Sequence, residues 1–220
     1  MAADERTAAP DAALGDDPEA LLAWWFGPPS PDGTIPDART AFWFAGGAAA
    51  DVECRARAGA LLERAIAGAL DAWAASPRSR LALVVLLDQI SRNVFRGTAR
   101  AFAQDPRALA LGLEALARGD ERALAPVERL FLYLPLEHAE DAAAQEESVR
   151  RFEALAAEAP EAARAAFETF AHHAREHRDC IRRFGRFPQR NAVLGRTPTP
   201  DEAAFLSGPG APGSVSPRGA

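Results

Sequence analysis

The sequence predicts an all-α protein: an array of antiparallel helical hairpins that resembles a tetratricopeptide-like superhelix, with about nine helices and no sheet. Hydrophobic residues recur at steps of three and four, and the strict alternation typical of strands is essentially missing. Proline repeatedly follows a capping residue, where it suits the first turn of a helix: Asp17-Pro18, Ser76-Pro77, Asp105-Pro106 and Thr199-Pro200. Short connections between so many helices favour antiparallel neighbours.

These signals predict helices over residues 18–26, 37–45, 50–75, 77–90, 106–118, 121–134, 138–158, 160–184 and 200–206. The last begins with a capping box, because Glu202 follows Thr199 by three residues. The 77–90 helix is apolar on nearly all sides, which places it at the centre of the fold.

The composition bounds the domain organisation. Small, polar and proline-containing segments at 1–16 and 208–220 predict a disordered lead and a disordered tail. Between them, residues 17–207 form one predicted all-helical domain. At 48% hydrophobic residues, the chain can bury a substantial core.

Charge and cysteine content narrow the classes of function. The net charge of −6 disfavours a general nucleic-acid binder, and the absence of lysine excludes Schiff-base chemistry on lysine. Cys54 and Cys180 match no metal or redox spacing. The acidic start lacks a signal core, and the longest apolar run, 81–87, is too short to cross a membrane. We therefore expect a cytoplasmic, soluble protein with no membrane partner, metal or cofactor.

A histidine interrupts the hydrophobic stripe of the 160–184 helix. His177 lies at helical spacing among the apolar residues Phe167, Phe170, Ala174, Ile181 and Phe184. A buried imidazole needs a hydrogen-bond partner. The residues between His173 and His177 are Ala174, Arg175 and Glu176, which do not match the zinc-protease motif, so a structural core histidine is favoured over a metal ligand.

The segment YLPLEHAED, residues 133–141, contains a second histidine and several carboxylates. We expect Pro135 to end one helix and the next to begin near Glu137 or His138, with His138 and Gln145 facing its packed side. Carboxylates at a helix start commonly act as caps. The alternative is an acid–base or metal cluster, whose catalytic candidates are His138, His177, Glu137 and Asp141.

The segment LLDQISRNVFRGT, residues 86–98, places a carboxylate at the inner end of the central helix. Asp88 must be paired there, and Arg92 and Arg96 are the nearest partners in the sequence. The pairing is typical either of a clasp that closes a helix end or of a pocket wall.

The segment RFGRFPQRNAVLGR, residues 183–196, is strongly basic. Gly185 is a natural helix stop, and Phe187-Pro188 predicts an extended turn. Residues 175–196 contain seven arginines and two acidic residues, whereas residues 114–168 contain thirteen acidic residues and six arginines. The two regions can pair with each other, or the arginines can bind an anionic ligand. ISRN at 90–93 and FPQRN at 187–191 echo each other and suggest paired helix-end clasps.

These three segments in this order, with AWWFG and AFWF near the start, resemble the bacterial domain-of-unknown-function family numbered 924 over roughly residues 18–207. The resemblance implies an all-α, tetratricopeptide-like fold and no particular activity. The positions that match the family pattern are Asp88, Gln89, Arg92, Asn93, Arg96, Glu137, His138, Glu140, Asp141, His177, Arg186, Arg190 and Asn191. Ser91 departs from a usual proline, and Gln189 departs from a frequent histidine.

Three hypotheses follow. The first is a groove that binds a small anionic molecule or peptide through Asp88, Arg92, Arg96, Glu140, Arg186, Arg190 and Asn191, between apolar walls of Trp24, Trp25, Phe42, Trp43 and Phe187. The second is an enzyme that uses the histidines and carboxylates named above. The third is a protein–protein scaffold with an exposed apolar patch at the Trp24–Trp43 end. The sequence leaves the oligomeric state and the ligand open.

Overall fold

The computed structural model describes residues 13–30 and 32–208, so the predictions for 1–12 and 209–220 lie outside the described residues. Contacts with the domain begin before the predicted boundary at residue 17. The Leu14 amide donates to the Arg57 carbonyl at 2.8 Å, and Asp16 pairs with Arg64.

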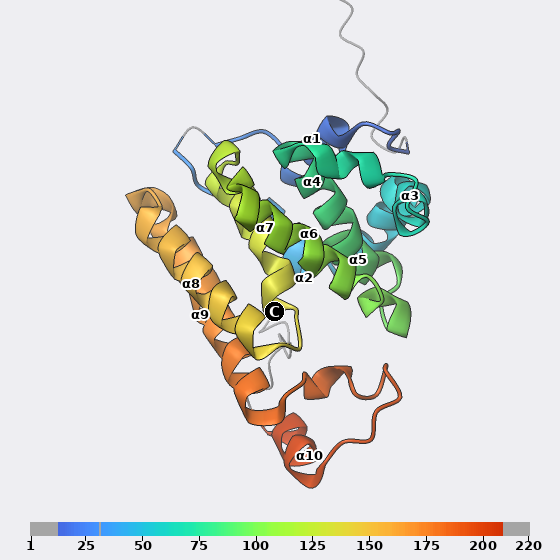
Figure 1. Cartoon of the computed structure of the whole chain (residues 1–220), viewed down its shortest axis with the longest axis vertical. Coiled ribbons are helices and arrows are strands. Elements are labelled where there is room, and N and C mark those ends of the chain that lie inside the picture. The colour runs from blue at the N-terminus through green and yellow to red at the C-terminus, as the bar shows by residue number, and fades with distance from the viewer. Residues whose placement is uncertain (1–12, 31, 209–220) are drawn as a thin grey trace, which may run out of the picture.

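The described residues are entirely helical outside their turns, which confirms the predicted all-α class (Figure 1). The helices are α1 (Pro18–Phe26), α2 (Asp37–Ala45), α3 (Gly47–Ile66), α4 (Pro77–Val84), α5 (Ser91–Val94), α6 (Asp105–Arg118), α7 (Pro126–Glu137), α8 (Ala142–Glu158), α9 (Glu161–Phe184) and α10 (Pro200–Ser207). Short 3-10 turns are η1 (Asp71–Ala75), η3 (Ala99–Phe102), η4 (Asp120–Ala123) and η5 (Pro188–Arg190).

The central helix is longer than predicted. A π-helical segment, η2 (Val85–Ile90), joins α4 to α5, so one continuous rod runs over 77–94. The rod packs against α1, α3, α6 and α7, and its residues 81–88 are essentially inaccessible to solvent. An apolar helix at the centre of the fold is therefore confirmed. A π segment widens the helical turn, and such segments occur frequently at functional sites.

The second half of the chain folds back and forth. Helix α7 packs on α8, and α8 packs along α9, with which it forms a long hairpin at one side of the molecule (Figure 1). The stripe predicted on the last long helix lies on this packed side, since Phe167, Ala174 and Ile181 are buried. The hairpins are compatible with the predicted tetratricopeptide-like array, which stays a prediction.

The predicted 50–75 helix is wrong at its C-terminal end. Helix α3 stops at Ile66, and Gly68 adopts a φ of 81° in the turn that leads to η1. Glycine reaches this left-handed conformation without strain, so the turn interrupts an otherwise helical pattern.

The predicted helix break at Pro135 is also wrong. Helix α7 continues through Pro135 to Glu137, and the next helix begins at Ala142, so His138 follows α7 instead of starting α8. Proline removes one backbone hydrogen bond from the helix. The buried side chains Leu130, Leu132 and Leu134 keep this segment packed despite that loss.

Candidate functional site

Asp88 is the centre of a buried polar cluster. The side chain lies on η2, in the most buried part of the central rod, with 0% of its surface exposed. Its carboxylate lies 2.8 and 2.9 Å from His138 Nδ1 and 3.2 Å from Arg92 Nη1, and it accepts a hydrogen bond from the Gln89 side-chain amide. These contacts supply the pairing that a buried carboxylate requires.

The partners of Asp88 determine its charge. Burial by itself would raise the pKa of this carboxyl, but the cation of Arg92 and the hydrogen-bonded His138 hold the pKa well below its ordinary value. Asp88 is therefore ionised at neutral pH. An ionised carboxylate only accepts hydrogen bonds, so Nδ1 of His138 is the donor.

His138 lies where α7 ends, and 16% of its side chain is exposed. With Nδ1 donating to Asp88, the other ring nitrogen, Nε2, carries the free lone pair of the neutral imidazole. Nε2 has no hydrogen-bond partner within residues 13–30 and 32–208. A histidine held in this way has a fixed tautomer and an available proton acceptor.

Arg92 belongs to the ISRN motif and Arg190 to the FPQRN motif, and both contact the carboxylate of Asp105. Arg92 contacts both oxygens of Asp105 at 2.9 Å, and Arg190 Nη1 contacts Asp105 Oδ2 at 3.0 Å. The Arg190 guanidinium also lies 4.6 Å from the ring centres of both Phe102 and Phe187. Asp105, which the sequence predicts as a helix-capping residue before Pro106, thus links the two motifs.

Glu137 and His177 form a second pair beside the first. His177 Nδ1 lies 3.3 Å from Glu137 Oε1 and 2.9 Å from the His173 carbonyl oxygen. Burial raises the pKa of Glu137 to about 7, partly offset by His138 and His173, and burial lowers the pKa of His177. Burial therefore shifts both groups towards their neutral forms.

The structure does not bring all of the predicted ligand-binding residues together. Arg96 pairs with Asp51 through two contacts of 2.6 and 2.8 Å, away from Asp88. Arg186 pairs with Glu202 at 2.6 and 2.8 Å, and Asn191 donates to the same carboxylate at 3.2 Å.

The two remaining candidates have separate structural contacts. Glu140 is clasped by Arg196 at 2.6 and 2.9 Å and accepts from the Phe187 amide at 2.7 Å. Asp141 caps α8 by accepting from the Ala144 amide at 2.8 Å, as a carboxylate at a helix start is expected to do.

The proposed aromatic walls lie elsewhere. Trp24, Trp25 and Trp43 are buried, and the rings of Trp25 and Trp43 pack against Phe131, so these tryptophans belong to the core. Phe187 alone among the predicted walls reaches the histidines, with its ring 5.4 Å from that of His177.

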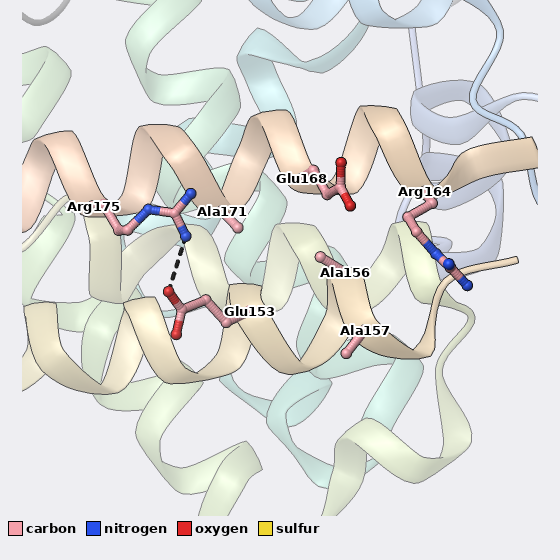
Figure 2. Close-up of a pocket in the computed structure, with 7 residues that line it drawn as sticks. All are labelled: Glu153, Ala156, Ala157, Arg164, Glu168, Ala171 and Arg175. Carbon is pink, nitrogen blue, oxygen red and sulfur yellow. Dashed lines mark hydrogen bonds and ion pairs between the residues drawn. The ribbon is translucent and has the colours of Figure 1, made fainter. Parts of the chain in front are cut away.

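An open hollow of about 350 Å³ lies between α8 and α9 (Figure 2). Its charged walls include the ion pair of Arg175 with Glu153, together with Arg164 and Glu168. None of the predicted site residues lines it.

Two further properties bear on the class of site. Among the residues that the structure describes, no three histidine, cysteine or carboxylate side chains are grouped to hold a metal ion. No helix in the described part of the chain combines the length and hydropathy that a membrane span requires.

Sequence reasoning missed two contributors to the cluster. Asp105 carries an ordinary capping signal, and Phe102 lies in a short 3-10 turn, so neither has a distinctive pattern. Gln145, by contrast, was expected on the packed side of its helix, where a polar amide occupies a hydrophobic stripe, and it is fully buried.

The fold and the cluster define a class: an all-helical protein in which a buried aspartate on a π-helical segment holds a histidine at a helix end. The chain belongs to the family described as bacterial protein of unknown function (DUF924), whose model matches residues 21–210. It is similar to the solved structure of a protein of unknown function, ATU0120, from Agrobacterium tumefaciens. The two share 37% identity with a TM-score of 0.73, over 86% of this chain and 96% of that one. No curated protein matches the chain.

Proposed function

We propose that this protein is an enzyme that uses His138 as a general base and acid on a small polar ligand. The contact between the buried Asp88 carboxylate and His138 Nδ1, at 2.8 Å, carries the proposal. It leaves Nε2 to take a proton from a substrate hydroxyl or a bound water, while Asp88 stabilises the imidazolium that forms. The same nitrogen then returns the proton to the leaving atom.

The charges around the pair favour proton transfer over simple capture of an anion. The four arginines assigned to an anionic ligand, at positions 92, 96, 186 and 190, all contact carboxylates of this chain. Arg92 and Arg190 balance Asp88 and Asp105 within the cluster. A ligand at His138 therefore meets nearly neutral surroundings, in which hydrogen bonds rather than net charge select it.

Conversion of an unknown substrate tests this proposal. The purified protein is incubated with a mixture of small metabolites, and consumption is followed by mass spectrometry. We expect H138Q and D88N to lose the conversion that wild type performs, by about 100-fold or more, because general acid–base catalysis contributes on that order.

The matched control is H172Q, since His172 is an exposed histidine of α9 that pairs with Glu176. H172Q should convert as wild type does. Equal conversion by wild type and H138Q, or no conversion by wild type across the mixture, would contradict the proposal.

A further inference from the structure

The end of α7 is held by side chains from two other parts of the chain. The last carbonyl groups of a helix have no partner within that helix. Gln145 Nε2, from α8, lies 3.3 Å from the carbonyl oxygen of Leu136, 2.7 Å from that of Glu137 and 2.8 Å from that of Ala139. Arg190 Nη2 donates to the remaining carbonyl, that of His138, at 3.0 Å.

Every backbone carbonyl from 136 to 139 thus faces a side-chain donor. His138 is the C-cap residue of α7, and no helical turn follows it directly, because α8 begins only at Ala142. Asp88 belongs to the rigid central rod and lies on the opposite side of the contact. The distance between Asp88 and His138 therefore depends on where residues 136–139 are held.

Gln145 contributes to this arrangement only as a donor. Its side chain is fully buried, and its Oε1 has no hydrogen-bond partner among the described residues. A buried acceptor without a partner costs free energy, whereas an apolar side chain of similar size would fill the same space without that cost. The contacts made by Nε2 are the interactions that an apolar residue cannot replace.

The position of Gln145 is itself well defined. The Asp141 side chain caps α8 by accepting from the Ala144 backbone amide, and the backbone amide of Gln145 donates to the Asp141 carbonyl oxygen at 3.0 Å. These bonds fix the first turn of α8, and the Gln145 side chain extends from this turn to three of the carbonyls of residues 136–139.

We propose that Gln145 is the positioning residue of His138: it clamps the carbonyls that flank this histidine and so keeps Nδ1 on Asp88 and Nε2 available. This inference rests on the proposed function, for which the orientation of His138 is essential. Gln145 acts through the backbone of the α7 end, and Arg190 completes the clamp.

The tautomer of His138 reports this role directly. Nitrogen-15 NMR of histidine-labelled protein distinguishes the Nδ1–H from the Nε2–H form, and H138Q assigns the signal. In wild type, at a pH where the ring is neutral, we expect the Nδ1–H form alone. In Q145M, which keeps the volume but loses the donor, we expect a mixture of both forms.

S148A is the matched control. Ser148 lies on the same face of α8, is also fully buried, and its Oγ has no hydrogen-bond partner in the described part of the chain. S148A should keep the single Nδ1–H form. A folded Q145M that also keeps it would overturn the inference.

Two further results keep this test decisive. Should Q145M fail to fold, Q145N withdraws the amide by one methylene, and the same mixture is expected; a single unchanged tautomer in folded Q145N contradicts the clamp.

With a substrate from the metabolite screen, Q145M should lower kcat by about 10-fold with little change in KM, as a displaced catalytic group does. A mixed tautomer in Q145M with undiminished conversion by H138Q would retain the clamp and reject the proposed function.

Discussion

Glu137 and His138 are neighbours in the chain, yet their side chains have different partners. His138 contacts the ionised Asp88, whereas Glu137 contacts His177 in surroundings that favour neutral groups. The difference arises because successive residues at a helix end point in different directions. One lies against the central rod, and the other lies against α9.

The raised pKa of Glu137 predicts a specific pH dependence of stability. Its folded value of about 7 exceeds the ordinary 4.5, so its contribution to stability is complete below pH 4.5 and is lost as the pH rises through about 7. E137Q stays neutral at all pH values. Between pH 4.5 and 8, wild type should therefore lose roughly 2–3 kcal/mol of unfolding free energy relative to E137Q.

Urea unfolding at several pH values measures this difference. The lowered pKa of His177 makes stability rise with pH in both proteins, so the comparison reports the difference that Glu137 makes, including its contact with His177. E168Q, at an exposed carboxylate on α9, should reproduce the wild-type pH dependence. Parallel curves for wild type and E137Q would mean that Glu137 is ionised in the folded protein at neutral pH.

At the scale of elements, the approach of α6 to α7 depends on a residue without a side chain. A Cβ at Gly112 of α6 would lie 3.3 Å from the Leu132 carbonyl oxygen of α7. This backbone contact lets α7, with its internal proline, pack closely against α6. Gly59 of α3 differs, because a Cβ there would lie 3.7 Å from the Arg55 side chain, an ordinary contact.

The same substitution should therefore have unequal effects at these two glycines. G59A should raise the unfolding free energy by about 0.5–1 kcal/mol, since alanine favours helix over glycine. G112A gains the same propensity but pushes on a backbone atom, so we expect it to be less stable than G59A by about 1 kcal/mol or more. Thermal or urea unfolding of both variants provides the comparison. Equal stabilisation would show that α6 and α7 separate without cost.

At the scale of the whole molecule, the apolar residues buried within 13–30 and 32–208 pack into a main cluster and a smaller one. The main cluster includes the central rod and its surrounding helices. The smaller one consists of Cys180, Ile181 and Phe187, with Phe184 and Phe205 packed against it. The C-terminal segment 185–208 is therefore attached mainly by this small cluster and by ion pairs such as Arg186 with Glu202 and Arg196 with Glu140.

We expect this segment to open independently of the main body. Local opening requires less free energy where few apolar contacts are broken. Hydrogen exchange followed by mass spectrometry should show faster exchange in peptides from 188–207 than in those from α4 and α7. Peptides from α8 serve as the reference for a peripheral helix on the main core. Equal protection of 188–207 and α4 would mean that the two clusters unfold as one unit.

At the level of single helices, much of the architecture could be predicted from the sequence. Apolar spacing and capping signals placed α1, α6, α9 and α10 within a residue of their observed ends. The failures occurred at Gly68, where a left-handed glycine turn ends α3, and at Pro135, where buried packing carries α7 past a proline. The predicted 121–134 helix also begins too early, because the 3-10 turn η4 precedes the start of α7 at Pro126. For the site, Asp88 was correctly expected to need a partner, and Arg92 was correctly expected to be one of them.

The sequence by itself determined the helical class, the buried central helix and the family, because these depend on local spacing and on motifs that can be read along the chain. Only the tertiary structure decided which charges meet. Asp88 and His138 are fifty residues apart, and Arg190 and Asp105 are eighty-five residues apart. From the sequence alone, several acidic residues are equally good candidate partners for each arginine. The packing of the helices determines which of them the arginine contacts.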